Sequence, residues 1–277
     1  MKCFYHSADL DGHCSGAIVK YFHPGCELFG IDYGDTFPWD DIRRNEKVIM
    51  VDFSLQPWKD MQRLDAMTNL VWIDHHKSAI ASQKAEPLKT AKVIWGQGNA
   101  ACELTWAQLF HGNKVPTVVH LLGRYDVWDH SDPNTLPFQY GLRLEDTNPE
   151  NQVLWRRLFQ SEEEIAGILL NGSTVLRYIN QEYEKYVRTC AFETELDDLR
   201  CIAVNRMLTN SQVFDSVWDA DRYDAMLTFG WKNGKWTVSL YSDKDDVDVS
   251  QIAKARGGGG HKGAAGFQCQ DLPFELT

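Results

Sequence analysis

Carboxylate and imidazole side chains gather in four short segments in the first half of the chain. Ligands of this kind suit Mn²⁺ and other first-row divalent cations, whereas softer metals are bound by thiolates. The carboxylates and imidazoles are more numerous than one ion needs. Two ions about 3.5–4 Å apart could therefore share a bridging carboxylate and a hydroxide that attacks phosphorus. The segments are His6-Ser-Ala-Asp9-Leu-Asp11-Gly12, Asp52 at the end of Val48–Asp52, Asp74-His75-His76, and Asp126 in Arg124–Trp128.

Each segment also has an ordinary structural explanation. Asp11-Gly12 is a common turn sequence, and Asp52 or Asp126 alone could cap a helix. Neighbouring histidines such as His75 and His76 occur on ordinary protein surfaces. All four segments, however, follow the predicted end of a strand or a helix in one half of the chain, and this shared position favours a single site for two metals.

Short apolar runs alternate with helical patterns in this half, which predicts a parallel sheet covered on both faces. The carboxyl ends of parallel strands meet at one edge, so segments far apart in sequence can converge there. We expect strands at Lys2–Tyr5, Lys47–Val51 and Leu70–Ile73, and helices at Cys14–Phe22, Pro57–Met67, Ala100–Phe110 and Pro116–Leu122.

The pattern changes near residue 150. Ser161 and Glu164 have the spacing of a capping box, and apolar residues at helical spacing follow. Asn171-Gly172 is expected to interrupt or kink this helical stretch. Strands return at Arg200–Val204, Ala225–Trp231 and Trp236–Tyr241, with a hairpin turn at Lys232–Lys235.

These patterns predict an α/β protein with two domains. The first, at 1–150, is a Rossmann-like parallel-sheet domain that binds the metals. Helices at 151–195 link it to a smaller mixed-sheet domain at 196–277, which binds the substrate.

A glycine run near the C-terminus carries a second signal. A flexible linker is its ordinary explanation, but glycine lets backbone N–H groups approach an anion closely. Ala264–Phe267 is a plausible helix start, and a helix N-terminus would also favour negative charge. The imidazole and ammonium groups beside the run could bind phosphate. The expected substrate-binding residues here are Gly258, Gly259, Gly260, His261 and Lys262.

Composition narrows the function. The net charge of −11 argues against a groove for long duplex nucleic acid, which is bound largely by neutralising phosphates. The seven cysteines form no Cys-x-x-Cys pair, which fits a reducing cytosol rather than a zinc ribbon. There is no apolar stretch typical of a signal peptide or a membrane span. We therefore expect a cytoplasmic protein with no membrane partner, and a homodimer is left open.

Together these motifs resemble the DHH phosphoesterase superfamily, subfamily 1, with its DHH-associated C-terminal domain, along nearly the whole chain. Asp74-His75-His76 is similar to the motif that names the superfamily, and Gly257–Phe267 to its C-terminal signature G-G-G-H-x-x-A-A-G-F. Asp9–Gly12 and Tyr125–Asp129 are most similar to the branch of small oligoribonucleases, the nanoRNases. Relatives include 3′-phosphoadenosine-5′-phosphate phosphatases, dinucleotide phosphodiesterases, RecJ exonucleases and family II pyrophosphatases.

The resemblance implies a role for each residue. His76 would contact the scissile phosphate without binding metal, and His261 with the glycine run would hold the substrate across a cleft between two lobes. One metal would be bound by His6, Asp9 and Asp52, and the other by Asp11, Asp52, His75 and Asp126, so that Asp52 bridges the two.

Two positions depart from the pattern of the family. Many relatives have Ser-Leu-Arg-Ser where this chain has Ser239-Leu-Tyr241-Ser242. The phosphate-binding arginine is therefore missing there, or it is replaced by Arg206, Arg256 or Lys262. In addition, only two residues separate His6 from Asp9 where some branches have three, which could alter the coordination of the first metal.

The resemblance predicts a hydrolase that cuts short oligonucleotides (nanoRNA) or dinucleotides to 5′-mononucleotides, with His76 and Asp52 as catalytic residues. It would use two divalent ions, Mn²⁺ first and Mg²⁺ or Co²⁺ as alternatives. Competing hypotheses are a 3′-phosphoadenosine-5′-phosphate phosphatase, a pyrophosphatase or polyphosphatase, and a non-catalytic nucleotide sensor. The complete set of carboxylates argues against the sensor.

Overall fold

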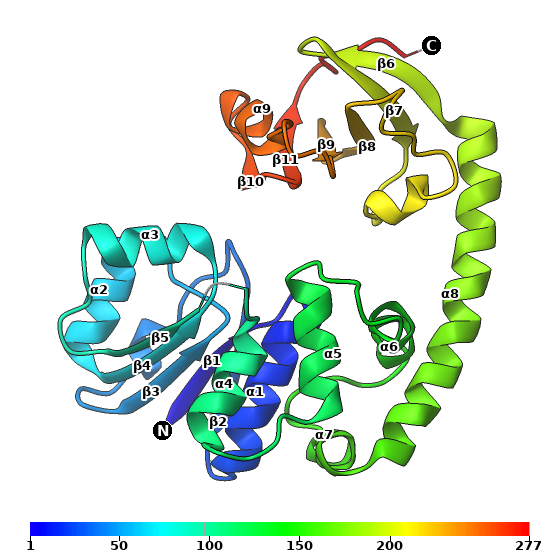
Figure 1. The fold of residues 1–277 in the computed structure, drawn as a ribbon. Helices are drawn as coiled ribbons and strands as arrows, with labels where there is room; N and C mark the ends of the chain where they lie inside the picture. The colour runs from blue at the N-terminus through cyan, green and yellow to red at the C-terminus, as the bar shows by residue number, and fades with distance from the viewer. Residues whose placement is uncertain (97, 277) are drawn as a thin grey trace. The chain divides into compact units, whose positions relative to one another are not determined.

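The computed structural model describes residues 1–96 and 98–276, which fall into two compact units, Met1–Leu176 and Arg177–Thr277 (Figure 1). Each unit is built around its own sheet. In the described part of the chain, no helix combines the length and the apolar character that crossing a bilayer requires.

Unit 1 contains the predicted parallel sheet. Its five strands lie in the order β2-β1-β3-β4-β5, and every neighbouring pair is parallel. The two outer strands were not predicted from the sequence. Both are only partly buried, and their apolar runs, Leu-Phe and Val-Ile-Trp, are shorter than those of the inner strands β3 and β4. The strands are β1 (Lys2–His6), β2 (Glu27–Ile31), β3 (Lys47–Val51), β4 (Asn69–Asp74) and β5 (Lys92–Trp95).

Helices cover both faces of this sheet (Figure 1). On one face, Phe4, Met50 and Trp72 pack against α2 (Trp58–Met67) and α3 (Lys77–Ala85). On the other face, alternating residues of the same strands pack against α1 (Leu10–Phe22) and α4 (Ala101–Leu109). Because successive strand residues point to opposite faces, the near-continuous apolar strands can fill both cores at once.

The rest of unit 1 is helical and packs on α1 and α4. It comprises α5 (Thr117–Asp126), α6 (Thr135–Leu142), α7 (Gln152–Gln160) and the first part of α8 (Glu162–Cys190). A short 3₁₀ turn, η1 (Trp39–Asp41), lies between β2 and β3.

The prediction that Asn171-Gly172 interrupts this helix was wrong, because α8 runs unbroken for 29 residues. Gly172 instead permits close helix packing. A Cβ atom there would lie 1.7 Å from the carbonyl oxygen of Pro137 in α6. A Cβ atom on Gly141 would likewise lie 2.1 Å from the carbonyl oxygen of Ile168 in α8. The two helix backbones therefore touch at these glycines.

Unit 2 contains the predicted mixed sheet, with six strands in the order β10-β11-β9-β8-β7-β6. Only β7 and β8 pair in parallel, and the other pairs are antiparallel. One face packs on α9 (Val249–Ala255), and the other on η2 (Ser211–Phe214) and the end of α8. The strands are β6 (Phe192–Leu196), β7 (Leu199–Asn205), β8 (Ala225–Lys232), β9 (Lys235–Tyr241), β10 (Gly259–His261) and β11 (Ala264–Cys269).

The predicted hairpin joins β8 to β9. Asn233 and Gly234 have φ values of 52° and 78°, and two consecutive positive φ values are what a type I′ turn requires. The sequence therefore identified this turn correctly.

The helix expected to begin at Ala264–Phe267 is absent, and this segment forms strand β11 instead. Part of the glycine run forms β10, which pairs antiparallel with β11, so the two backbones lie very close together. A Cβ atom on Gly258 would lie 2.1 Å from the carbonyl oxygen of Gly266, and one on Gly260, where φ is +141°, 2.5 Å from that of Ala264. The run also follows the C-terminus of α9, so a helix N-terminus cannot contribute to anion binding there.

Candidate metal centre

The structure brings the predicted ligands of unit 1 together at the carboxyl edge of its sheet. His6 is the last residue of β1, Asp52 directly follows β3, and Asp74 is the last residue of β4. The chain continues through His75 and His76 into α3. The strand-end positions inferred from the sequence therefore explain why these residues meet.

Helix ends position the remaining carboxylates. Helix α1 begins at Leu10, earlier than the predicted Cys14, because the side chain of Asp9 accepts a hydrogen bond of 2.8 Å from the N–H of Gly12 and caps the helix. Asp11 lies in the first turn of α1, and its two oxygens accept hydrogen bonds of 2.8 Å from Ala101 N and Cys102 N at the start of α4. Asp126 is the last residue of α5.

His6 forms a first cluster with Asp9 and Asp52. Its Nδ1 lies 3.0 Å from Asp9 Oδ2 and 3.7 Å from Asp52 Oδ2. One ligand atom from each of the three residues lies within 4.8 Å of the others, as a shared metal ion requires. The short spacing from His6 to Asp9 thus still allows the two side chains to meet.

His75 forms a second cluster with three carboxylates. Its Nε2 lies 3.2 Å from Asp126 Oδ2, 3.4 Å from Asp52 Oδ1 and 3.8 Å from Asp11 Oδ2. The two clusters are therefore joined through Asp52, whose Oδ2 faces His6 and whose Oδ1 faces His75.

Several of the candidate ligand atoms lack the hydrogen bonds that their burial would require. Both oxygens of Asp52, Oδ2 of Asp126 and Nδ1 of His6 are buried without a hydrogen-bond partner. Nδ1 of His6 lies 3.0 Å from Asp9, yet the two groups do not have hydrogen-bond geometry. Buried polar atoms are normally paired, so converging unpaired atoms of these types fit a divalent cation.

The pKa shifts indicate that these buried carboxylates lack a compensating positive charge. Burial, followed by repulsion from Asp11, raises the pKa of Asp52 and of Asp126 well above the ordinary value for a carboxyl group. Burial alone would lower the pKa of His6, but the neighbouring carboxylates of Asp52 and Asp9 outweigh it and raise that pKa to about 11. A bound cation would relieve the repulsion between the carboxylates.

Asp74 fixes the position of His76. Asp74 is fully buried, and its Oδ1 accepts hydrogen bonds from the backbone N–H groups of His75 and His76 at 2.7 and 3.0 Å. The same oxygen lies 2.7 Å from Nδ1 of His76, so Nε2 is the ring nitrogen left for other contacts. The sequence placed Asp74 in the motif but did not indicate this supporting role.

The sequence analysis missed Asp32, whose Oδ1 lies 3.2 Å from Nε2 of His6. Asp32 directly follows β2, and that strand was itself not predicted. An aspartate at the end of an unrecognised strand carries no signal of its own in the sequence.

In unit 2, the substrate-binding residues predicted from the sequence lie on and beside β10. Gly259, Gly260 and His261 form the strand and Lys262 follows it, all of them exposed. The ammonium group of Lys262 donates a hydrogen bond to the backbone oxygen of Asp245, which limits its freedom to bind a ligand.

Two arginines were proposed to replace the one missing at Tyr241, and their side chains have different partners in the structure. Arg256 forms two hydrogen bonds, of 2.6 and 2.7 Å, with Asp197. Arg206 instead stacks over Tyr183 and Tyr186, at 4.9 and 4.7 Å from the ring centroids. In the residues that the structure describes, the guanidinium of Arg206 has no carboxylate partner.

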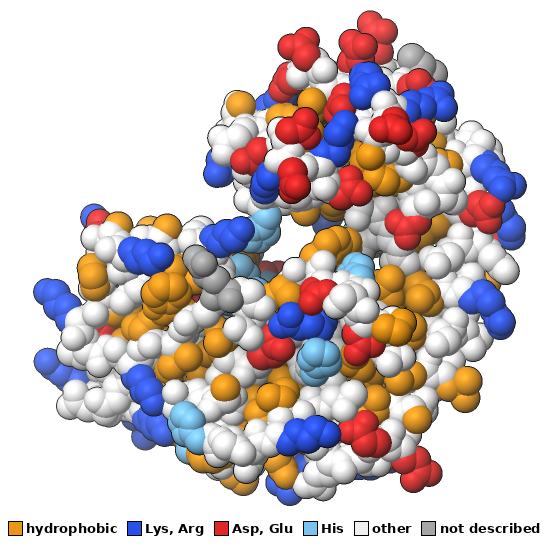
Figure 2. Space-filling view, in the orientation of Figure 1, with side chains coloured by type: hydrophobic (Ala, Val, Ile, Leu, Met, Phe, Trp, Pro, Cys, Tyr) orange, Lys and Arg blue, Asp and Glu red, His pale blue; other side chains and the backbone are white. Residues whose placement is uncertain are grey.

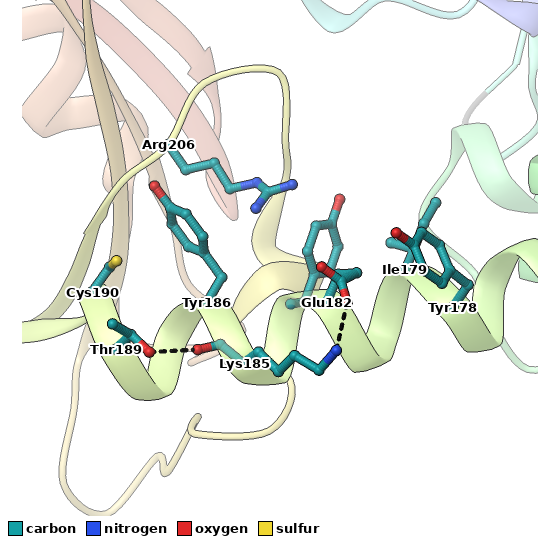
Figure 3. Close-up of a pocket in the computed structure, with 9 residues that line it drawn as sticks. Tyr178, Ile179, Glu182, Lys185, Tyr186, Thr189, Cys190 and Arg206 are labelled. Carbon is teal, nitrogen blue, oxygen red and sulfur yellow. Dashed lines mark hydrogen bonds and ion pairs between the residues drawn. The ribbon is translucent and has the colours of Figure 1, made fainter.

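Arg206 lines a hollow of about 540 Å³ along the last turns of α8, which we call the α8 hollow. Figure 3 shows Arg206 reaching over Tyr186 on this side of the helix. Besides these two residues and Tyr183, it is lined by Tyr178, Ile179, Glu182, Lys185, Thr189 and Cys190.

No protein-family model matches the sequence. A relative from Acanthamoeba polyphaga mimivirus, described as the uncharacterized protein R106, is 24% identical over 309 residues, which cover 98% of this chain and 69% of the relative.

Solved structures are more informative. The pGpG-specific phosphodiesterase PggH from Vibrio cholerae superposes with a TM-score of 0.59 at 13% identity, over 96% of this chain and 92% of that one. The DHH domain of a protein described as a member of a family of ribosomal proteins gives a TM-score of 0.61 at 14% identity, over 96% and 81% of the two chains. This chain has the fold of the DHH phosphoesterase superfamily.

The DHH fold extends over both units. An exopolyphosphatase-related protein from Bacteroides fragilis superposes with a TM-score of 0.52 at 14% identity, over 98% of this chain and 87% of that one. The five-stranded parallel sheet and the six-stranded mixed sheet correspond to the two domains of such proteins. The clusters of His and Asp described above are consistent with a divalent metal site in the first of them.

Proposed function

We propose that this protein is a metal-dependent phosphoesterase of the DHH superfamily, which hydrolyses short oligonucleotides or dinucleotides to 5′-mononucleotides. The observation that carries the proposal is the position of Asp52. It joins two clusters of His and Asp, and both of its oxygens are buried without a hydrogen-bond partner. Asp52 could therefore serve two cations at once, and two neighbouring cations would stabilise the attacking and leaving oxygens in the cleavage of a phosphate ester.

In this proposal each cluster holds one cation, Mn²⁺ first and Mg²⁺ or Co²⁺ as alternatives. When bound, the cations supply an activated water molecule and neutralise charge on the phosphate oxygens. The first ion would be held by His6, Asp9 and Asp52, and the second by Asp11, Asp52, His75 and Asp126.

His76 contacts the scissile phosphate and holds a proton close to it. Asp74 fixes Nδ1 of the ring, so Nε2 is the atom that reaches the substrate. Burial alone would lower the pKa of His76, but the hydrogen bond and charge of Asp74, together with the charge of Asp52, outweigh it and raise this pKa, which favours the protonated ring. A protonated imidazole is a suitable donor to a phosphate oxygen.

Charge supports a short substrate. The net charge is −11, and on the face seen in Figure 2 the lysines and arginines are scattered among acidic and apolar side chains. Such a surface offers few phosphate contacts to a long strand. The description of PggH as specific for pGpG, a dinucleotide, agrees with a small substrate.

Unit 2 is proposed to hold the substrate through Gly258, Gly259, Gly260 and His261, with Lys262 and Arg206 as additional cations. We place the protein in the cytoplasm, and the finding that all seven of its cysteines are free supports a reducing compartment.

The test is a product assay with Mn²⁺ on four substrates: a dinucleotide, a five-nucleotide RNA, a nucleoside 3′,5′-bisphosphate and pyrophosphate. We expect the first two to give 5′-mononucleotides, and binding of short substrates to show a shallow log–log salt slope, on the order of −1 to −3. Release of inorganic phosphate from only the bisphosphate, or cleavage of only pyrophosphate, would overturn the proposed substrate. A steep slope with preference for long strands would instead indicate an exonuclease.

A further inference from the structure

The imidazole of His6 presents its Nδ1, not its Nε2, to the first cluster. Nδ1 lies 3.0 Å from Asp9 Oδ2 and 3.7 Å from Asp52 Oδ2, whereas His75 faces the second cluster with its Nε2. The Nε2 of His6 lies instead 3.2 Å from Oδ1 of Asp32. Among the residues that the structure describes, the ligand atoms that converge in these clusters do not include those of Asp32. The function proposed above gives this carboxylate no role.

The pairing of β1 with β2 places Asp32 beside the ring. His6 lies opposite Ile31 in this parallel pair, and the N–H of Ser7 donates a hydrogen bond of 3.0 Å to the backbone oxygen of Ile31. Asp32, the next residue, is held in a turn. Its N–H donates to Oδ2 of Asp35 at 2.8 Å, and its backbone oxygen accepts the N–H of Asp35 at 3.1 Å. The backbone therefore fixes the position of the carboxylate.

Two aromatic rings restrict how the imidazole of His6 can turn. Its centroid lies 5.7 Å from that of Phe53 and 5.6 Å from that of Tyr33. The rings of Phe53 and Tyr33 also contact each other, at 4.8 Å. Oδ1 of Asp32 accepts the N–H of Tyr33 at 2.7 Å, so the same oxygen is tied to the loop that carries this ring. A rotation that exchanged the two nitrogens of His6 would have to disturb this packing.

A carboxylate beside Nε2 decides which nitrogen of His6 can bind a cation. A neutral imidazole has one N–H and one lone pair, and a carboxylate, which only accepts, favours the N–H on the nitrogen that it faces. With the N–H on Nε2, the lone pair is on Nδ1. Nδ1 is the atom that is buried without a hydrogen-bond partner in the described chain. A carboxylate on the outer nitrogen is a common way to orient a histidine toward a metal.

We propose that Asp32 is a positioning residue for the first cation, because it accepts the Nε2–H of His6 and thereby presents the lone pair of Nδ1 to the ion. Asp32 acts through His6 and is not itself a ligand. Nδ1 is closer to the backbone than Nε2, which suits a partner such as Asp9, only three positions along the chain. The inference rests on the proposed function only in that the first cluster holds a cation.

The test is a double-mutant cycle on Mn²⁺ affinity, measured by calorimetry in an Asp126→Asn background that is expected to retain the first ion. Asp32→Ala should weaken binding of this ion by about 10- to 100-fold, the usual cost of losing such a carboxylate. When His6→Gln is also present, Asp32→Ala should change the affinity by less than about twofold, because the residue through which Asp32 acts is absent. An equal loss in both cases would make Asp32 a ligand or a general source of negative charge, and would overturn the inference.

Two further variants separate this role from charge and from loop structure. Asp32→Asn keeps the shape of the side chain and a carbonyl oxygen that can accept the Nε2–H, so it should regain most of the affinity that Asp32→Ala loses. Asp40→Ala is the matched control, since it removes an exposed carboxylate from the same connection between β2 and β3, and it should leave the affinity unchanged. A loss in Asp40→Ala as large as that in Asp32→Ala would reduce the effect to net charge and overturn the inference.

A second readout depends on neither turnover nor affinity. In the ¹⁵N-labelled protein loaded with Zn²⁺, the ring-nitrogen shifts of His6, assigned with His6→Gln, should show metal on Nδ1 and a proton on Nε2. Asp32→Ala should lose this signature, and Asp40→Ala should keep it. Metal on Nε2 in the wild type would overturn the inference. If the wild type shows the signature but cleaves none of the four substrates, the proposed function fails and the role of Asp32 stands.

Discussion

Oδ1 of Asp74 lies 2.7 Å from Nδ1 of His76 and also accepts the backbone N–H of the same residue. Asp74 therefore fixes both the backbone and the ring of the histidine. A carboxylate beneath an imidazole selects which nitrogen faces outward, as it does for histidines in many catalytic sites.

Substitutions at this pair should reduce turnover and leave the metal ligands in place. We expect His76→Gln to lower kcat by about 10²- to 10³-fold, because proton donation near phosphorus is lost. Asp74→Asn should cost about 10- to 100-fold, because the ring loses its orientation while the donor remains. Steady-state kinetics and Mn²⁺ calorimetry check both. Loss of metal in His76→Gln would show that His76 is a ligand, contrary to its proposed role.

Asp52→Asn should be the most damaging single carboxylate change. Each oxygen of Asp52 faces a different cluster, so its loss should reduce the Mn²⁺ stoichiometry at both sites. Asparagine suits the comparison because it tolerates the φ of +56° that Asp52 adopts. Asp126→Asn, which touches one cluster, is the matched variant and should retain one ion. If Asp52→Asn retained more activity than Asp126→Asn, another group would have to bridge the metals.

His261→Ala should separate substrate capture from metal binding. The variant removes an exposed imidazole of unit 2 and none of the carboxylates of unit 1. A lost charge-assisted contact of about 1.5–3 kcal/mol corresponds to about a 10- to 150-fold fall in kcat/KM on a dinucleotide. Mn²⁺ affinity should not change, whereas Asp11→Asn should lose both metal and turnover. Loss of metal in His261→Ala would instead make His261 a ligand, and no loss at all would make the glycine strand purely structural.

Arg206→Gln should raise KM by about 10-fold with little change in kcat, because the guanidinium over Tyr183 and Tyr186 is available to a phosphate. Arg256→Gln is the control. Its guanidinium is already paired with Asp197, so its removal should lower the melting temperature without a matching change in KM. The assignment fails if Arg256→Gln has the larger effect on KM.

Asp224 gives unit 2 a stability that depends on pH. Hydrogen bonds from Arg200 and Lys244 hold the pKa of Asp224 well below its usual value. This contribution is therefore present above the unfolded-state pKa of about 3.9 and is lost as the pH falls below it. Asp224→Asn should reduce the free energy of unfolding at pH 7 by about 1 kcal/mol, a typical value for such a pair.

Denaturant melts at pH 7 and at pH 3 check this prediction, since the difference between variant and wild type should shrink in acid. Asp246→Asn, at an exposed position in the same unit, should have no effect at either pH. A difference for Asp224→Asn that persisted unchanged at pH 3 would contradict an electrostatic cause.

The sequence predicted the part of the site that depends on strand order. His6, Asp52 and Asp74 follow buried apolar strands, and parallel pairing then requires their ends to meet. It did not indicate the contact of Asp11 with the start of α4, because about ninety residues separate the partners and neither side has a local signature. Edge strand β2 was not predicted because most of its residues are exposed or only partly buried and its apolar run is short. Asp32, which directly follows this strand, was missed for the same reason.

Glycine was the residue most often misinterpreted. Gly172 was taken as an interruption because glycine weakens an isolated helix, whereas here the missing side chain allows α6 and α8 to touch. The run that includes Gly258 and Gly260 was expected to lead into a helix, but its close backbone approach to β11 fixes a hairpin. Both outcomes depend on a distant neighbour that local propensity does not contain.

The distribution of thiols along the chain has a practical consequence. Five cysteines are buried, Cys269 is partly covered, and Cys190, at the end of α8, is exposed. Burial raises the pKa of Cys26 to about 11 and that of Cys201 to about 12, which suppresses their reactivity at neutral pH. In a Cys269→Ser background, a maleimide fluorophore should therefore attach at Cys190 alone. Since Cys190 lines the same hollow as Arg206, the emission of that dye would report directly when a ligand enters.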